Sequence, residues 1–421
     1  MKRRLKDIAL DLTAWLPVIG LLIVVSAMPY GWSGYQRIGC YLLVISYIVW
    51  FFASRQWRAI RWNHFQWLYV IMIALWAMLP IRQLFDTTPA TDYYQQQCHL
   101  HEWFLYTGII GLLGFPDKLK LRHVAYVMLA TSIAMLAHCA YLYFGTTEYS
   151  LAEPFMRLNI LRRTMIHSHM VTDLYANTAL ILGFVTLREV PRRWQQILIG
   201  AGMALTWLFI LLSEGRIGML SSMLIVGVAG FYYLFQKSRI AAFAGGALVA
   251  LLAIAVYTHH PHVLEMRGKK DPRIVVWDYS WRMGKEKPVC GYGLSSLSKE
   301  FVENMYTDQE TYTGFIQTTI EPIPIFAEQG KTMHTHHPHN AFLMYWLAVG
   351  IIGVLLLVAL FAVAAWLPMG RDRIFLWLFL LILLLQCMTE PIGPHVMPQF
   401  IAVLMFVWER ASLRANHADN S

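Results

Sequence analysis

Long apolar runs separated by short polar connections extend along the whole chain. A run of roughly 17–25 mainly apolar residues is long enough to cross the hydrocarbon core of a bilayer as a helix. By this criterion the sequence contains about twelve spans, of which the fourth, eleventh and twelfth are short enough to be tilted or re-entrant. The approximate spans are Leu12–Met28, Tyr35–Phe52, Phe65–Ile81, Trp103–Phe115, Val124–Phe144, Met170–Leu187, Ile197–Leu212, Ile217–Phe235, Ile240–Tyr257, Ala341–Leu367, Ile374–Cys387 and Phe400–Trp408. The pattern predicts an all-α polytopic membrane protein.

The composition excludes soluble classes of protein. Of the 421 residues, 57% are hydrophobic and 14% are charged, whereas a soluble domain carries about a quarter charged residues. A soluble enzyme, a disordered scaffold and a disulfide-stapled secreted domain are therefore excluded for the chain as a whole. The net charge of +9 is compatible with nucleic-acid binding, but most Lys and Arg residues lie in short connections on one predicted side of a membrane. We therefore expect membrane lipids, and no nucleic acid, as partners.

Basic residues precede the first predicted span and follow every second span after it. They are Lys2, Arg3, Arg4 and Lys6, then Arg55, Arg58 and Arg61, then Lys118, Lys120 and Arg122, then Arg188, Arg192 and Arg193, then Lys237 and Arg239, then Arg371 and Arg373, and finally Arg410 and Arg414. Because Lys and Arg near span ends remain in the cytoplasm, both termini are predicted to be cytoplasmic. The clearest exception among the shorter loops is the group Arg157, Arg162 and Arg163, which this scheme places outside. The first span has no small-residue cleavage site after it, so we interpret it as a signal anchor.

The same scheme divides the chain into three regions. Residues 1–257 hold spans one to nine, residues 258–340 form a long outer loop, and residues 341–421 hold spans ten to twelve and a cytoplasmic tail. The loop is the one candidate for a folded unit outside the membrane. Cys98 and Cys290 both fall on the outer side, where a disulfide is permitted but cannot be assigned from sequence.

Arg216 stands on the outer side, between two apolar runs and directly after Glu214 and Gly215. The positive-inside rule disfavours an arginine here, and a cation at a helix N-terminus opposes the helix dipole. An anionic ligand would offset both effects. The alternative is an interfacial anchor, or an ion pair with Glu214.

A second group of residues begins at Pro272, which suits the first turn of a helix. Three side chains at four-residue steps share one face of this helix: Arg273, Trp277 and Trp281. Lys287-Pro288 is expected to end it, and Gly291 and Gly293 permit tight turns afterwards. We expect an amphipathic helix on the outer membrane surface, with Arg273 facing either a ligand or phospholipid headgroups.

Four histidines precede the tenth apolar run, which we expect to be one long helix: His334, His336, His337 and His339. Asn340 is a suitable N-cap and Pro338 keeps the preceding backbone extended, so His339 is predicted to lie just outside the helix start. Zinc binding is disfavoured because no Asp, Glu or Cys completes a catalytic zinc pattern. A proton-accepting role fits better, although His334 and His336 are more simply explained as surface polar residues.

Two cations and one base are thus expected at the outer ends of helices late in the chain. The sequence has no Walker motif and no GxGxxG before a helix. Such a set suits transfer from a lipid diphosphate, in which arginines hold the leaving diphosphate and a histidine deprotonates an attacking hydroxyl.

Three blocks of sequence also carry a family resemblance. Ser213–Arg216 precedes a span, Arg-x-x-x-Trp is followed by Glu-Lys-Pro-x-x-Gly-x-Gly between Arg273 and Gly293, and His-Pro-His-Asn-x-Phe-Leu is followed by Gly350-Ile351-Ile352-Gly353. In this order and spacing they resemble the O-antigen ligase and polymerase superfamily across Met203–Phe361. The first half of the chain is similar only in its run of spans.

The resemblance implies a GT-C-type helical fold, a periplasmic active site in the bacterial inner membrane, inversion at the transferred carbon, and no metal or ATP cofactor. It implies that Arg216 and Arg273 bind diphosphate and that His339, beside Asn340, is catalytic, with His337 as an alternative and Trp277 as a supporting residue. The single long loop is similar to that of O-antigen ligases, which join glycan carried on undecaprenyl diphosphate to lipid A-core.

Three other functions remain open from the sequence. A polymerase would use the same donor with a second lipid-linked glycan as acceptor, and a protein-glycosylating ligase is equally compatible with the motifs. A polytopic transporter would usually carry charged groups near the middle of interrupted helices. The predicted spans contain almost no charged residues, which disfavours the transporter.

Overall fold

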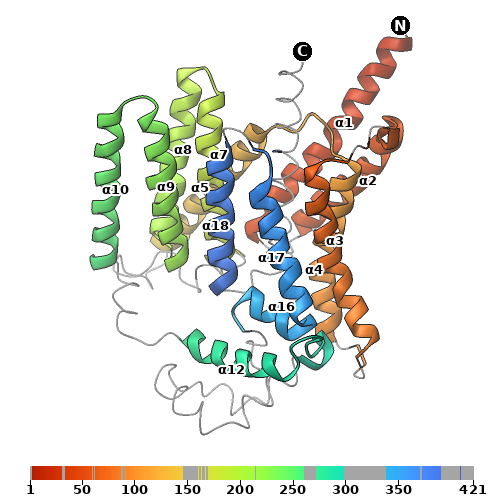
Figure 1. Ribbon diagram of the computed structural model, residues 1–421. Helices are drawn as coiled ribbons and strands as arrows, with labels where there is room; N and C mark the ends of the chain where they lie inside the picture. Colours follow the sequence, from red (N-terminus) through yellow and green to blue (C-terminus); the bar gives the residue numbers. More distant parts are fainter. Residues whose placement is uncertain are drawn as a thin grey trace.

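The chain folds into a bundle of helices in the computed structural model, which describes residues 2–30, 34–58, 60, 62–86, 89–90, 92–145, 160, 163, 166, 169–213, 215–259, 272–297, 338–369, 372–389 and 408. All of the longer elements in these ranges are helices (Figure 1). They are α1 (Lys2–Ala27), α2 (Gly34–Ala53), α3 (His64–Leu84), α4 (Asp92–Leu113), α5 (Leu121–Gly145), α7 (His169–Glu189), α8 (Arg193–Leu211), α9 (Arg216–Phe235), α10 (Arg239–His259), α12 (Pro272–Glu286), α16 (Ala341–Val349), α17 (Ile351–Trp366) and α18 (Arg373–Thr389). Short 3₁₀ turns follow α1 and α2.

The polytopic helical membrane class predicted from the sequence is confirmed. Within the described part of the chain, 8 helices are long and apolar enough to cross a membrane, and α17 and α18 are shorter apolar helices. Helix α4 has the length of a span, but its first half is polar. The last predicted span, Phe400–Trp408, lies outside the described residues apart from Trp408. About twelve spans, and the division at residues 258–340, stay predictions.

The prediction of one continuous helix over Ala341–Leu367 is wrong. The chain forms α16 and α17 instead, and the break falls at Gly350, whose φ is +79°. Gly350 ends α16 by donating its N–H to the carbonyl of Trp346 at 2.8 Å. The apolar pattern continues unchanged through the break, so hydropathy alone cannot reveal it.

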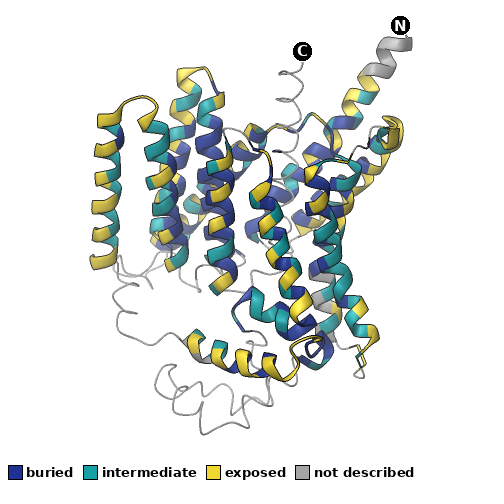
Figure 2. Ribbon diagram, in the orientation of Figure 1, coloured by how far each residue is buried: buried dark blue, intermediate teal, exposed yellow. Residues whose placement is uncertain are grey.

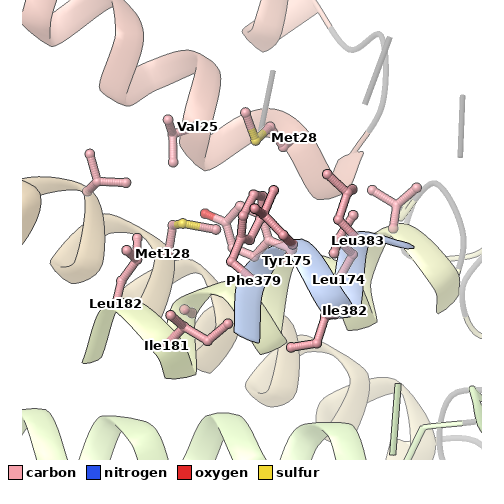
Figure 3. Packing of buried hydrophobic residues seen from close by; sticks show 14 of the residues in the cluster. Val25, Met28, Met128, Leu174, Tyr175, Ile181, Leu182, Phe379, Ile382 and Leu383 are labelled. Atoms are coloured by element: carbon pink, nitrogen blue, oxygen red, sulfur yellow. The ribbon is translucent and has the colours of Figure 1, made fainter. Parts of the chain in front are cut away.

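Helix α7 is the centre of the bundle. In the apolar 18-residue stretch of α7, 89% of the residues are buried. The corresponding share is 33–39% in the other long apolar helices, except α10, where it is 6%. Figure 2 shows the same contrast, with α10 largely exposed at the edge. Buried side chains of α1, α5 and α18 pack on α7 around Tyr175, among them Met128 and Phe379 (Figure 3). Helix α7 is therefore surrounded by protein, and α10 presents most of its surface outward.

The two ends of the bundle differ in charge and in content. The α7–α8 and α9–α10 connections, which carry Arg192 and Lys237, lie at the upper end in Figure 1. The start of α9, all of α12 and α16 lie at the lower end. Helix α12 crosses this end roughly perpendicular to the long helices, an orientation that suits a helix at a membrane surface. The predicted site residues on these helices thus lie at one end, opposite these two basic connections.

Replacing Gly350 by alanine is predicted to destabilise the protein. An added Cβ would lie 1.9 Å from the carbonyl oxygen of Val289, and the backbone conformation is one that L-residues avoid at a cost of about 1–3 kcal/mol. We expect a lower midpoint of thermal unfolding in detergent.

Gly200→Ala in α8 is the matched control, because a Cβ there meets no atom within 4 Å. Alanine is also the better helix former, so this variant should unfold at or slightly above the wild-type midpoint. Equal midpoints for Gly350→Ala and the wild type would contradict the role of the break.

Candidate functional site

Arg216 is the first residue of α9, as the sequence predicted, and its side chain is exposed. Gly215 is the N-cap of this helix, and its N–H donates to the hydroxyl of Ser213 at 3.2 Å. Both Ser213 and Gly215 are buried. A buried, hydrogen-bonded turn therefore presents an exposed guanidinium group at the lower end of the bundle.

The first turn of α9 packs on α7 through residues that the sequence analysis did not select. Asp173 of α7 is 1% exposed, and its Oδ2 lies where a side chain on Gly215 or Gly218 would begin. One turn further along α7, the amide of Asn177 donates to the carbonyl of Gly218 at 3.0 Å. An aspartate inside an otherwise apolar span was the available signal.

Helix α12 begins at Pro272 and ends at Glu286, directly before the Lys287-Pro288 stop that the sequence predicted. Arg273 and Trp277 are both half-buried, while Trp281 is largely exposed. The common face that the four-residue spacing predicts is therefore partly covered at its first two positions and open at the third.

Helix α12 is held against α16 by Trp346, another residue that the sequence analysis missed. Its indole packs so closely on Gly284 that an added Cβ would lie 2.8 Å from Cε3 of the ring. The Trp281 and Trp346 rings meet edge to face at a centroid distance of 4.9 Å. The Trp346 indole N–H also donates to the carbonyl of Pro288 at 3.1 Å.

The segment after α12 binds the helix break through main-chain groups. The N–H groups of Tyr292 and Gly293 donate to the carbonyls of Leu347 and Ala348, at 2.7 and 3.0 Å. The N–H of Ile351, at the start of α17, donates to the carbonyl of Pro288 at 2.9 Å. Two motifs that the sequence presents separately, one ending at Gly293 and one beginning at Gly350, thus form one structural unit.

Arg82, at the end of α3, fixes this unit to the N-terminal half of the chain. Its Nε donates to the carbonyl of Cys290 at 2.7 Å and its Nη2 to that of Gly291 at 3.2 Å. The hydroxyls of Ser295 and Ser296 donate to Gln83 at 2.8 Å and to Asp86 at 3.2 Å. Arg82 was not among the predicted site residues, although the positive-inside rule disfavours an arginine at the end of a span that is predicted to lie outside.

Asn340 is the N-cap of α16, as predicted. Its side-chain oxygen accepts a hydrogen bond from the N–H of Leu343 at 3.1 Å, and its amide donates to the carbonyl of Met388 in α18 at 3.0 Å. His339 precedes it, half-buried and with a φ of 48°, in the left-handed region. The cap therefore fixes the backbone of His339 between α16 and α18. His337, the alternative base, lies outside the described residues, as do His334 and His336.

A continuous series of contacts connects these helices. Helix α9 packs on α7 and α18, the end of α18 holds Asn340, and α16 packs on α12. All five cysteines, including Cys98 and Cys290, are free, so the disulfide that the sequence permitted is not formed. No group of three His, Cys, Asp or Glu residues that could hold a metal ion occurs within the described ranges.

Comparison with known proteins identifies the region that holds these residues. No curated protein matches the chain. A family model described as O-antigen ligase matches residues 201–358. The matched region contains α9, α12 and α16, and with them Arg216, Arg273, His339 and both glycine motifs. It agrees with the limits Met203–Phe361 over which the sequence resemblance was found. Through this region, the chain is similar to the O-antigen ligase family.

Proposed function

We propose that the protein is a glycosyltransferase of the bacterial inner membrane, acting at its periplasmic face. It transfers O-antigen glycan from undecaprenyl diphosphate to a sugar hydroxyl of lipid A-core. One observation carries the proposal. Within the O-antigen ligase region, the start of α9 with Arg216, helix α12 with Arg273 and the start of α16 beside His339 lie at the same end of a helical membrane bundle, opposite the basic α7–α8 and α9–α10 connections.

Arg216 and Arg273 hold the diphosphate of the donor. A guanidinium group is planar and permanently charged, and it binds phosphate oxygens in pairs, which suits a leaving group that gains negative charge as it departs. Arg216 is the first residue of α9, and Arg273 lies in the first turn of α12. Trp277, one turn beyond Arg273, supports this face of α12.

His339 accepts the proton of the acceptor hydroxyl. The acceptor oxygen forms a bond to the anomeric carbon while the bond from that carbon to the diphosphate breaks, and the diphosphate leaves with the electron pair. Attack opposite the leaving group inverts the anomeric configuration. The proton moves to the imidazole, which must be neutral beforehand. The donor is already activated and the arginines neutralise its diphosphate, so we propose that neither metal nor ATP is required.

The identity of the acceptor is tested in a strain that lacks the gene. Loss of all long lipopolysaccharide ladders, with undecaprenyl-linked polymer retained, is expected on gel analysis because only the last transfer would be blocked. Complementation by the wild-type chain should restore the ladders. A single-repeat band would instead identify a polymerase, and normal lipopolysaccharide with unglycosylated protein would identify a protein-glycosylating ligase.

Substitution of the arginines should impair transfer while the protein still accumulates in the membrane. Arg216→Ala removes a charged donor and is expected to lower the rate of transfer about 10²–10³-fold. Arg273→Lys keeps the charge but loses the planar pair of donors, so a smaller loss is expected.

The matched control is Arg282→Lys on the same helix α12, because Arg282 is exposed and pairs with Asp278 at 2.5 Å. This variant should transfer glycan at the wild-type rate. If Arg216→Ala transfers normally, the residue does not belong to the site; if it is lost from the membrane, its role is structural.

Removal of the base should slow transfer without preventing binding of the donor. Because His339 lies in the left-handed region, asparagine is the better replacement, since it adopts this backbone conformation at low cost. We expect His339→Asn to bind donor normally and to transfer about 10²–10⁴-fold more slowly. His337→Ala is measured beside it, with His259→Ala, an exposed histidine at the end of α10, as control.

The assignment of the base is decided by comparing these variants. If His337→Ala loses transfer and His339→Asn keeps it, the base is His337. If both variants transfer normally, the proposal that His339 or His337 accepts the proton is wrong.

A further inference from the structure

Helix α7 carries a carboxylate where a membrane protein would ordinarily have an apolar side chain. Asp173 is 1% exposed and lies four residues after the first residue of α7, close to the lower end of the bundle. Burying an ionisable group in a membrane span is costly, so such a group is retained where it serves a function. The roles proposed for Arg216, Arg273 and His339 do not use it.

Asp173 packs against two glycines at the start of α9: Gly215, which is the N-cap, and Gly218, which lies in the first turn. An added Cβ on Gly215 would lie 1.6 Å from Oδ2 of Asp173, and one on Gly218 would lie 2.2 Å from the same atom. Only glycine at both positions lets α9 approach the carboxylate this closely. Asp173 therefore contacts the start of α9 both before and after Arg216 in the sequence.

The charge of the carboxylate suits this location. The first turn of a helix leaves N–H groups without partners inside the helix, and the N-terminus carries a partial positive charge. A buried carboxylate beside it is stabilised, and in return it stabilises the helix start. It also offsets part of the unfavourable interaction between the Arg216 guanidinium and the same helix end.

We propose that Asp173 is a positioning residue for Arg216. Its carboxylate fixes the first turn of α9 against α7, so that the exposed guanidinium is held in one place at the lower end of the bundle. This inference rests on the proposed function of Arg216 as a ligand of the donor diphosphate. Asn177 lies one turn after Asp173 in α7. Its amide donates a hydrogen bond to the carbonyl of Gly218 and so also holds the first turn of α9.

A packing role and a positioning role predict different results for one conservative substitution. Asp173→Asn keeps the size and shape of the side chain but removes its charge. If Asp173 only fills space, this variant should behave as the wild type. If its charge holds the start of α9, binding of diphosphate should weaken about tenfold.

The experiment measures binding of undecaprenyl diphosphate to purified full-length variants, together with their midpoints of thermal unfolding. The variants are Asp173→Asn, Arg216→Ala and the double substitution. Thr178→Val is the matched control, because Thr178 is equally buried on α7 but donates to the carbonyl of Leu174 in its own helix at 2.7 Å. It should bind as the wild type does.

We expect Asp173→Asn to weaken binding about tenfold in the wild-type background and to change nothing further in Arg216→Ala. An additional loss in the double substitution, or wild-type binding by Asp173→Asn, overturns the inference. Wild-type binding by Arg216→Ala overturns the proposed role of Arg216 as well, so the two failures are distinguishable.

If Asp173→Asn does not accumulate, the same contact is tested from α9. Gly218→Ala places a methyl group against the carboxylate and should weaken binding of undecaprenyl diphosphate. An added Cβ at Gly218 would lie 2.2 Å from Oδ2 of Asp173, so this variant displaces the start of α9. Wild-type binding by Gly218→Ala would show that the contact does not position Arg216.

Discussion

The main-chain contact between the segment after α12 and the break at Gly350 is the constraint on which the arrangement of the proposed site depends. A helix that ends inside a membrane protein exposes carbonyl groups that water cannot reach, and each would be costly to leave without a partner. Tyr292 and Gly293 supply the N–H groups for the last turn of α16, and Pro288 in turn accepts from α17. The segment after α12 therefore supplies partners for main-chain groups on both sides of the break.

This constraint links parts of the chain that are far apart in sequence. Arg82 binds the carbonyls of Cys290 and Gly291 from α3, 208 and 209 residues away. The N-terminal half lies outside the matched family region, yet it supports the turn that positions α12. The end of α3 therefore contributes to the structure of the matched family region.

The helix starts and stops of the proposed site could be predicted from the sequence because they depend on local chemistry. Asn340 caps α16, Pro272 begins α12, and Arg216 begins α9, each for reasons contained in a few neighbouring residues. The break at Gly350 could not, because only the sign of φ distinguishes this glycine from others in apolar runs.

The partners of Arg82 and Asp173 could not be predicted either. Their contacts depend on which helices become neighbours, and a hydropathy pattern fixes the spans without fixing their packing. For both residues the sequence still contained a signal, since one is a cation on the predicted outer side, where cations are disfavoured, and the other is an acid within an apolar run.

The turn between Pro288 and Gly291 is bound mainly through its own N–H and C=O groups, and this leaves the side chains of Val289 and Cys290 available for other uses. Val289 is 58% exposed and Cys290 is an exposed, free thiol. A spectroscopic label attached to Cys290 would therefore sit directly beside the end of α16 without replacing any group that holds the turn. It would report on the surroundings of the helix break from a position that main-chain hydrogen bonds hold.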